Sequence, residues 1–443
     1  MEYNFSRKIQ WVKKSGLSLK IVSELGSSEL FLTRHRRASS DFTRNRKLPF
    51  IKILQLLISK SVKSIQLVLN EWSEALGSVV SASAYSQARH KVKHTAFIEL
   101  LEKSVIEVMY GDNDYKTFKG HRLLAIDGSS LRLPNTPETR EKFGFVEHMN
   151  GMNSSLSGQV EAKMTVLYDV LNRIPIAGNL DGGRVNDVKA SEIHIQRLKK
   201  RDILLADRAF GSYRFFAQIL GQNANFVIRC KEKTYEKYHQ LFSQTTKKDV
   251  IAELKAPLTV THDASIPKTI KVRFVRVILP TGEVEVLATS LTDRRLYPHS
   301  VFKKLYNQRW RIETFFQELK SRLCVDNFTG KSVESIYQDF YSTLFVSGLE
   351  SIITEEANRE LGEKQTIYSQ QVNKSISFHT IKNTVVRLIF EQPPNFEEKI
   401  KKLFLANPTI ARPERRKPPR PDSSSGTNRK SLYFQRYAKK HVY

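Results

Sequence analysis

The chain has 443 residues, 40% of them hydrophobic, which is enough for a large core spread over about two to four structural units. Lys and Arg number 72 against 45 Asp and Glu, a formal net charge of +27. Like charges repel in a compact state, so this excess is typical of a protein with a polyanionic partner, the alternative being a merely basic globular protein. No uncharged apolar run approaches about 18 residues and the N-terminus carries no apolar signal-peptide core, so we expect no membrane partner.

Cysteine usage points to a reducing compartment. Cys230 and Cys324 are the only cysteines, so the chain has neither a disulfide framework nor a cysteine zinc site. We therefore expect a cytoplasmic protein.

The first segment, residues 1 to about 115, has apolar residues at helical spacing, and Gly77 is predicted to end a helix. Ser83 is predicted to cap a helix over 84–93 that exposes polar residues, among them Arg89. Two basic clusters, at 34–37 and 44–47, precede this helix. They are either DNA contacts or solvated loops.

From about residue 121 the pattern changes to buried strands. Five strands are predicted, at 123–126, 160–171, 174–180, 203–206 and 226–228. A helix is predicted at 187–200, between the third and the fourth strand. The first strand is expected to end at Asp127 and the fourth at Asp207. Three strands, a helix, a strand, a helix and a strand indicate an α/β fold with a mixed sheet and flanking helices.

Residues 231–285 interrupt this order. Apolar and basic residues alternate over 270–279, and a turn signal at 280–283 precedes a further strand at 284–291, so we expect a mainly β insertion with a basic face. A strong helix over about 299–323 and an amphipathic helix over about 333–360 follow. The domains we expect are an α-helical DNA-binding domain (1–115), the first part of the core (116–230), the insertion (231–285), the second part of the core (286–350), a helical C-terminal region (351–411) and a basic disordered tail (412–443).

Three separated carboxylates are the candidates for chemistry. Asp127 and Asp207 each follow an apolar strand, where open sheets collect ligands, and Glu313 lies on the helix after the insertion. An aspartate after a strand is also a common turn former. Together, in so basic a chain, the three suggest a site for a hard cation such as Mg²⁺, which prefers carboxylate oxygen.

The helix that carries Glu313 also carries a polar stripe. At 100° per residue, Tyr306, Arg309, Glu313 and Lys320 fall on one narrow face, beside apolar residues that we expect to be buried (Leu305, Ile312, Phe316 and Leu319). A solvated face with helix salt bridges is the alternative explanation.

At these residues the sequence resembles the DDE transposases of bacterial insertion sequences, specifically the insertion-sequence-four group. That group's signature (Tyr, two residues, Arg, three residues, Glu, six residues, Lys) is matched without a gap by Tyr306, Arg309, Glu313 and Lys320. The segments 126–134 and 205–210 resemble the family's two aspartate segments, although Ala209 stands where a glycine is common. Residues 83–89 resemble its N-terminal helical region, and the resemblance covers roughly 80–345.

This resemblance implies a ribonuclease-H-like core in which Asp127, Asp207 and Glu313 hold two Mg²⁺ or Mn²⁺ ions. It implies cleavage at transposon ends, the terminal inverted repeats, and strand transfer into double-stranded target DNA, carried out by a homodimer. Tyr306, Arg309 and Lys320 are expected to grip phosphates. In some relatives a tryptophan of the insertion stacks on a flipped base. The insertion here has none, so if a base is flipped, either Tyr235, Tyr238 or another aromatic serves, or the base is held differently.

Two other functions stay open at this point. One is a ribonuclease-H-like endonuclease without strand transfer, and the other is a non-catalytic DNA-binding protein or repressor derived from a transposase.

Overall fold

The computed structural model describes residues 11–44, 46–148, 157–279, 282–389 and 395–410, and the expected basic tail lies outside them. The chain divides into two compact units. Unit 2 runs from Tyr115 to Glu318, and unit 1 combines the residues before Tyr115 with those from Leu319 onward. Among the described residues, no helix combines the length and the apolar character needed to cross a membrane.

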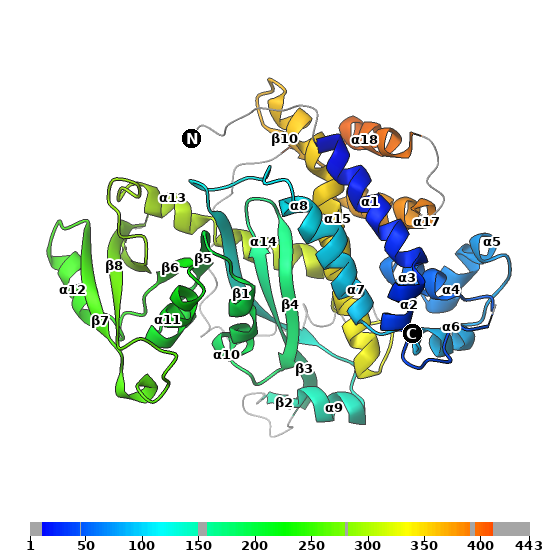
Figure 1. Ribbon diagram of the computed structural model, residues 1–443, viewed down its shortest axis with the longest axis horizontal. Coiled ribbons are helices and arrows are strands. Elements are labelled where there is room, and N and C mark those ends of the chain that lie inside the picture. Colours follow the sequence, from blue (N-terminus) through cyan, green and yellow to red (C-terminus); the bar gives the residue numbers. More distant parts are fainter. Residues whose placement is uncertain (1–10, 45, 149–156, 280–281, 390–394, 411–443) are drawn as a thin grey trace. The chain divides into compact units, whose positions relative to one another are not determined.

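Unit 2 is built on one mixed sheet (Figure 1). Its strands are β1 (Arg122–Arg132), β2 (Phe145–His148), β3 (Ser157–Asp169), β4 (Ile174–Gly182), β5 (Asp202–Ala206), β6 (Asn225–Arg229), β7 (Asp249–Lys255), β8 (Thr269–Ile278) and β9 (Val284–Thr289). They lie in the order β2-β3-β1-β5-β6-β9-β8-β7, with β4 also paired to β3. The pairs β1–β5 and β5–β6 are parallel, and the remaining pairs are antiparallel. This confirms the mixed α/β sheet.

Strand β1 does not end at Asp127 as predicted. Its antiparallel pairing with β3 continues through Asp127 (opposite Val166) to Arg132 (opposite Glu161). The parallel pairing with β5 has its last pair at Ala125, because β5 itself ends at Ala206. The predicted end of β5 before Asp207 is confirmed. A one-dimensional pattern finds where apolar residues stop, whereas a strand continues as long as one neighbour still pairs with it.

The helices of unit 2 are shorter than predicted. They are α9 (Pro137–Phe143), α10 (Asp187–Ser191), α11 (Tyr213–Gly221), α12 (Glu236–Gln244), α13 (Val301–Asn307) and α14 (Trp310–Ser321). The helix expected over 187–200 is an α-helix only as far as Ser191 and continues as the 3-10 helix Glu192–Arg197. The helix expected over 299–323 is interrupted after Asn307. Gln308 and Arg309 instead donate to carbonyls three residues back, in a tighter turn.

The insertion extends the main sheet. After α12, the hairpin partners β8 and β9 join the sheet through β6, and β7 pairs with β8 at its far end. The predicted hairpin is confirmed, with Gly282 at φ +89 in its turn. The predicted basic face is wrong at Arg273, which is fully buried and 2.7 Å from Asp249 Oδ2.

The described part of unit 1 is almost entirely helical, which confirms the helical character predicted for the first segment over its described residues from Trp11 onward. Its helices before Tyr115 are α1 (Trp11–Ser27), α2 (Glu29–His35), α3 (Phe50–Ile58), α4 (Ile65–Glu71), α5 (Ser73–Leu76), α6 (Ala82–Arg89), α7 (Thr95–Leu100) and α8 (Glu107–Tyr110). Those after it are α15 (Val333–Glu363), α16 (Lys374–Thr380), α17 (Val386–Leu388) and α18 (Phe396–Ala406), with β10 (Gln370–Val372) paired to β11 (Pro408–Ile410). As predicted, Gly77 ends a helix, at φ 65.

The long helix α15 is the centre of unit 1 and packs against α1, α3, α7 and α18 (Figure 1). Most of its residues from 335 to 354 are buried. The helix predicted over about 333–360 is therefore confirmed, but it is enclosed on nearly all sides and is not a simple amphipathic surface helix.

Candidate active site

The sheet brings Asp127 and Asp207 to neighbouring positions. Ala125 pairs with Leu205 across the parallel strands β1 and β5. Asp127 lies two residues further along β1, and Asp207 is the first residue after the end of β5. Neighbouring strands lie about 4.8 Å apart, and the charge of Asp207 raises the pKa of Asp127, so the two carboxylates lie near each other.

The turn between α13 and α14 adds the third carboxylate. Arg309, only 6% exposed, lies in this turn. Its Nη2 is 3.1 Å from Glu313 Oε1 and its Nη1 is 3.8 Å from Asp127 Oδ2. One guanidinium thus joins the sheet carboxylate to the helix carboxylate. The spacing Arg-x-x-x-Glu permits this because both residues lie on one face of the helix that begins beside the turn.

The electrostatics of Asp127 reflect this crowding. The pKa of Asp127 is raised to about 6, mainly by burial and also by the charges of Asp207 and Glu313, although the Gly128 amide and Arg309 act to lower it. The Gly128 N–H donates to Asp127 Oδ1 at 2.8 Å. Asp127 is therefore a carboxylate that lacks sufficient compensating positive charge at neutral pH.

Asp207 has a local structural role as well. Its Oδ1 accepts from the Ala209 N–H at 2.7 Å and caps the short 3-10 helix Arg208–Phe210. The turn-forming explanation of this aspartate is thus correct for one of its oxygens. It does not exclude a second role, because a carboxylate can accept several hydrogen bonds and the side chain is only partly buried.

Tyr306 faces the same strand end. Its hydroxyl donates to the carbonyl of Ala206 at 3.3 Å, and burial raises its pKa. The phenol therefore ties α13 to the end of β5, immediately before Asp207. The apolar residues beside the stripe are buried as predicted, Ile312 and Leu319 completely.

Lys320, the last residue of the signature, lies in the last turn of α14. It belongs to unit 1, whereas Tyr306, Arg309 and Glu313 belong to unit 2. Its part in the site stays a prediction.

The carboxylates do not form a closed metal site as they stand. Within the part of the chain that the structure describes, no group of three or more His, Cys, Asp or Glu side chains is arranged to hold a metal ion. The donor set still suits one: Asp127, Asp207 and Glu313 offer carboxylate oxygens, and the pKa of Asp127 is raised by burial and by the charges of the other two.

Sequence reasoning missed two residues beside the site. Trp310, next to Arg309 in the chain, is 42% exposed, with its ring 4.3 Å from the Arg309 guanidinium carbon. Glu285 on β9 is 2.8 Å from Arg229, and Arg309 lowers its pKa although burial raises it overall. Glu285 could not be found from its local pattern, because it approaches the site only through the pairing of β9 with β6.

The tyrosines suggested for base stacking are not available on the surface. Tyr235 and Tyr238 are 8% and 5% exposed, and Tyr238 stacks on Phe274 with ring centroids 3.7 Å apart. They belong to the packing between α12 and the sheet, so the suggestion is wrong for these two tyrosines, and another aromatic or a differently held base stays a prediction. Trp310 is the exposed aromatic that the structure offers instead.

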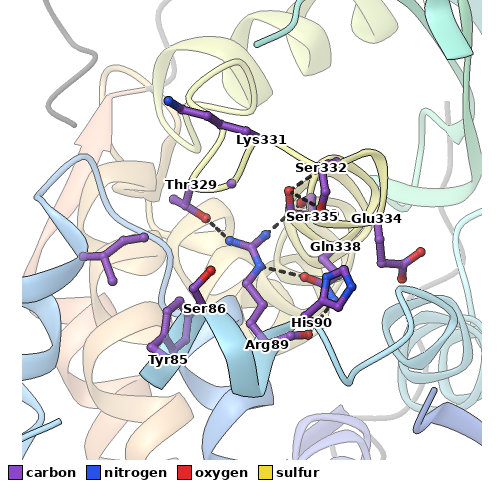
Figure 2. Close-up of a pocket in the computed structure, with 12 residues that line it drawn as sticks. Tyr85, Ser86, Arg89, His90, Thr329, Lys331, Ser332, Glu334, Ser335 and Gln338 are labelled. Carbon is purple, nitrogen blue, oxygen red and sulfur yellow. Dashed lines mark hydrogen bonds between the residues drawn. The ribbon is translucent and has the colours of Figure 1, made fainter. Parts of the chain in front are cut away.

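In unit 1, the segment 83–89 organises a buried network, shown in Figure 2. Helix α6 begins after Ser81, two residues before the predicted cap. Arg89 is buried, not exposed as predicted, and donates to Gln338, Thr329, the Ser335 carbonyl and Asp339. These contacts join α6 to α15 and to the loop before it, so Arg89 is a structural residue.

Comparison with known proteins identifies the family of the chain. The family model described as transposase DDE domain matches residues 118–349, more than half of the chain. The chain belongs to this family. It is 25% identical over 276 residues to the transposase InsG for insertion sequence element IS4 of Escherichia coli (strain K12), which supports the group predicted from the helix signature. That match covers 61% of this chain and 60% of the relative, less than two thirds of its length.

Among solved structures, the chain is similar to a piggyBac transposase synaptic complex with hairpin DNA, determined by cryo-EM. The TM-score is 0.42 at 12% identity, over 97% of this chain and 87% of the other. A likeness this distant supports no further statement.

Proposed function

We propose that this chain is a DDE transposase that cleaves DNA at the ends of a mobile element and joins them to target DNA. The observation that carries the proposal is the convergence of Asp127, Asp207 and Glu313 around Arg309. Carboxylates from three distant segments, crowded enough to raise a pKa, are what phosphoryl transfer with divalent cations requires. DNA, with its high charge density, is a matching partner for a chain of net charge +27.

We propose in addition that the core of unit 2 is ribonuclease-H-like. The support is its topology: three antiparallel strands in the order β4-β3-β1, continued by the parallel strands β5 and β6, with α10 and α11 in the connections. The site lies where β5 ends and where β1 continues beyond its pairing with β5, and side chains from several segments meet there.

Asp127, Asp207 and Glu313 would hold two Mg²⁺ or Mn²⁺ ions. Such ions, when bound, stabilise the charge on the attacking and leaving oxygens. The residues of this chain supply the geometry. Arg309 holds Asp127 and Glu313 towards each other, and Tyr306 fixes α13 to the end of β5. Arg309, Tyr306 and Lys320 are the residues we assign to the phosphates beside the cleaved bond.

Trp310 is the aromatic that we assign to a base at the cleavage site. It is exposed and lies against Arg309, so a base displaced from the duplex would find a flat apolar surface beside the carboxylates. Stacking on an aromatic ring is worth about 1–3 kcal/mol per base.

Unit 1 offers a groove for duplex DNA. A pocket with a volume of about 920 Å³ lies along α6 and the preceding loop, and its basic lining residues are Arg44, Arg46, Lys47 and Lys91. Asp41 is the acidic residue among the described lining residues, and it lies 3.7 Å from Lys91. We propose that this groove contacts DNA phosphates, as predicted for the basic cluster 44–47.

The test uses DNA that carries the candidate inverted repeats. With Mg²⁺ or Mn²⁺ the wild type is expected to nick and join these ends, and Glu313→Gln, Asp127→Asn and Asp207→Asn are each expected to bind DNA without cutting it. Glu318→Gln, on the same helix but about 140° around it, is the matched control and should cut normally.

The products separate the alternatives. Cleavage without joined products would indicate an endonuclease, and binding without metal-dependent cleavage would indicate a DNA-binding protein or repressor. Cleavage whose rate depends on the square of protein concentration would support the proposed homodimer. We place this activity in the bacterial cytoplasm, with the element's DNA.

A further inference from the structure

Unit 1 contains a second basic pocket, and none of the three carboxylates lines it. Its volume is about 380 Å³, and its charged lining residues are Lys60, Arg322, His379 and Lys382. None of the described residues that line it is acidic. A pocket lined by cations alone requires an explanation, because unpaired like charges destabilise the fold that brings them together.

Lys60 is the most unusual member of this cluster. It is 6% exposed, and its Nζ finds no hydrogen-bond acceptor among the described residues. Its nearest recorded contact is the ring of Phe328, at 5.5 Å from the centroid. Burial lowers its pKa. A buried ammonium with three unused donors is costly, so a native site of this kind normally has a partner.

Lys382 approaches Lys60 from another helix. It lies in the π-helical turn Ile381–Val385, a rare distortion that is frequent at functional sites, and its carbonyl accepts from the Ser59 hydroxyl at 2.7 Å. The pKa of Lys382 is lowered to about 8, mainly by burial and next by the charge of Lys60. The chain therefore holds two lysines close enough to repel each other.

The nearby acidic groups do not neutralise this pair. Asp339 is fully buried and is committed to Arg89 and to the amide and hydroxyl of Thr329. Asp326 is partly buried. It raises the pKa of Lys60, but its effect is smaller than the lowering by burial and smaller than the effects of Asp339 and Cys324. The cluster keeps an excess of positive charge, with the exposed Arg322 and His379 at its solvent side.

We propose that this pocket binds a phosphate group between Lys60 and Lys382, with Arg322 and His379 at its opening. A phosphate oxygen accepts hydrogen bonds from ammonium groups and compensates both charges at once. Ser375, which already accepts a hydrogen bond from Arg322, is placed to orient the group. The phosphate comes either from the DNA backbone or from free phosphate. The proposal does not depend on catalysis at the three carboxylates.

The first experiment measures the unfolding temperature of the full chain with increasing inorganic phosphate, at constant ionic strength and without divalent metal. A ligand that binds only the folded state raises this temperature saturably. We expect such a rise for the wild type, and at least about tenfold weaker apparent phosphate binding for Lys60→Met and Lys382→Gln. Lys399→Gln, an exposed lysine on α18, is the control and should respond as the wild type does.

Without phosphate, Lys60→Met should be at least as stable as the wild type, because it removes a buried charge without leaving a cavity. If this variant is stable but does not respond to phosphate, the lost response is not caused by a loss of folding.

The second experiment measures the affinity for duplex DNA as a function of salt concentration. If the pocket takes a backbone phosphate, the slope of log affinity against log salt falls by about 0.9 in both variants. If it takes free phosphate, the slope is unchanged while the response to phosphate is still lost. A wild type without a saturable response, or variants that keep it, would overturn the proposal.

Discussion

Arg309 places its Nη1 at 3.8 Å from Asp127 Oδ2, which makes it the positive charge that the structure records closest to that carboxylate. One guanidinium is insufficient, since the same group lies 3.1 Å from Glu313 Oε1 and the pKa of Asp127 is still raised to about 6. The carboxylate cluster is therefore strained electrostatically when no cation is bound, and this strain is measurable as a dependence of stability on pH.

The first prediction concerns this dependence. The folded pKa of Asp127 lies above its unfolded value, so its contribution to stability is present at low pH and is lost as the pH rises through about 6. In metal-free protein, Asp127→Asn should match the wild type below about pH 4 and exceed it at pH 8, by at most about 3 kcal/mol. Urea unfolding with a chelator at several pH values measures this, and Mg²⁺ should reduce the difference. If the free energy of unfolding of the two proteins changed with pH in the same way, the raised pKa of Asp127 would be contradicted.

The second prediction concerns Gly128, the residue after Asp127. A Cβ at this position would lie 2.1 Å from Asp187 Oδ1, and Asp187 Oδ1 itself is 3.0 Å from Lys163 Nζ. Gly128→Ala should therefore displace either α10 or the part of β1 that carries Asp127. We expect a loss of about 1–3 kcal/mol of stability and at least about tenfold in cleavage rate.

The double variant Gly128→Ala with Asp187→Ala should recover most of this loss, because the colliding carboxyl group is gone. Gly221→Ala, where nothing lies within 4 Å of the added Cβ, is the neutral control. Failure of the double variant to recover would show that Asp187 is needed for another reason.

How far the sequence predicts this site depends on the kind of contact. Asp207 was placed correctly because an apolar run and a local turn define the end of β5. The position of Asp127 within β1 was missed, because pairing with β3 rather than hydrophobicity extends the strand. The helical stripe was predicted as continuous, yet the turn at Gln308 and Arg309 interrupts it, and the Arg309–Glu313 contact persists because it spans a single turn.

Local sequence patterns do not predict contacts between distant segments of the chain. Arg89 was expected on an exposed face, since its helix alone shows no buried side; the partners that bury it lie about 240 residues later in the chain. Arg273 was expected on a basic strand face for the same reason, and its partner Asp249 becomes visible only through the pairing of β7 with β8. Charged residues that are buried with a distant partner are the cases that local pattern cannot resolve.

The third prediction concerns Arg89. Arg89→Ala leaves Asp339 fully buried without its cation, which should lower the free energy of unfolding by about 3–5 kcal/mol. The half-exposed ion pair of Arg34 with Glu99 is the control, and Arg34→Ala should cost less than about 1 kcal/mol. Denaturant unfolding of the three proteins measures this. A cost for Arg89→Ala no larger than that for Arg34→Ala would show that the network in Figure 2 does not stabilise unit 1.

The last prediction separates phosphate contact at the site from general attraction to DNA. Arg309→Ala and Lys320→Ala should reduce cleavage by about 100-fold while overall DNA affinity falls much less, because many of the 72 basic residues share the affinity. Arg309→Lys should not restore cleavage, since the ammonium cannot reach Asp127 and Glu313 with two separate nitrogens as the guanidinium does. Lys304→Ala, an exposed basic residue on α13, is the matched control and should leave cleavage unchanged. We would measure cleavage rates at saturating DNA and DNA affinities by fluorescence anisotropy for each variant. A larger loss in the cleavage rate than in the affinity would support phosphate contact at the site. Equal losses in the two measurements, or none, would mean that the stripe is only a solvated face whose ion pairs stabilise the helix.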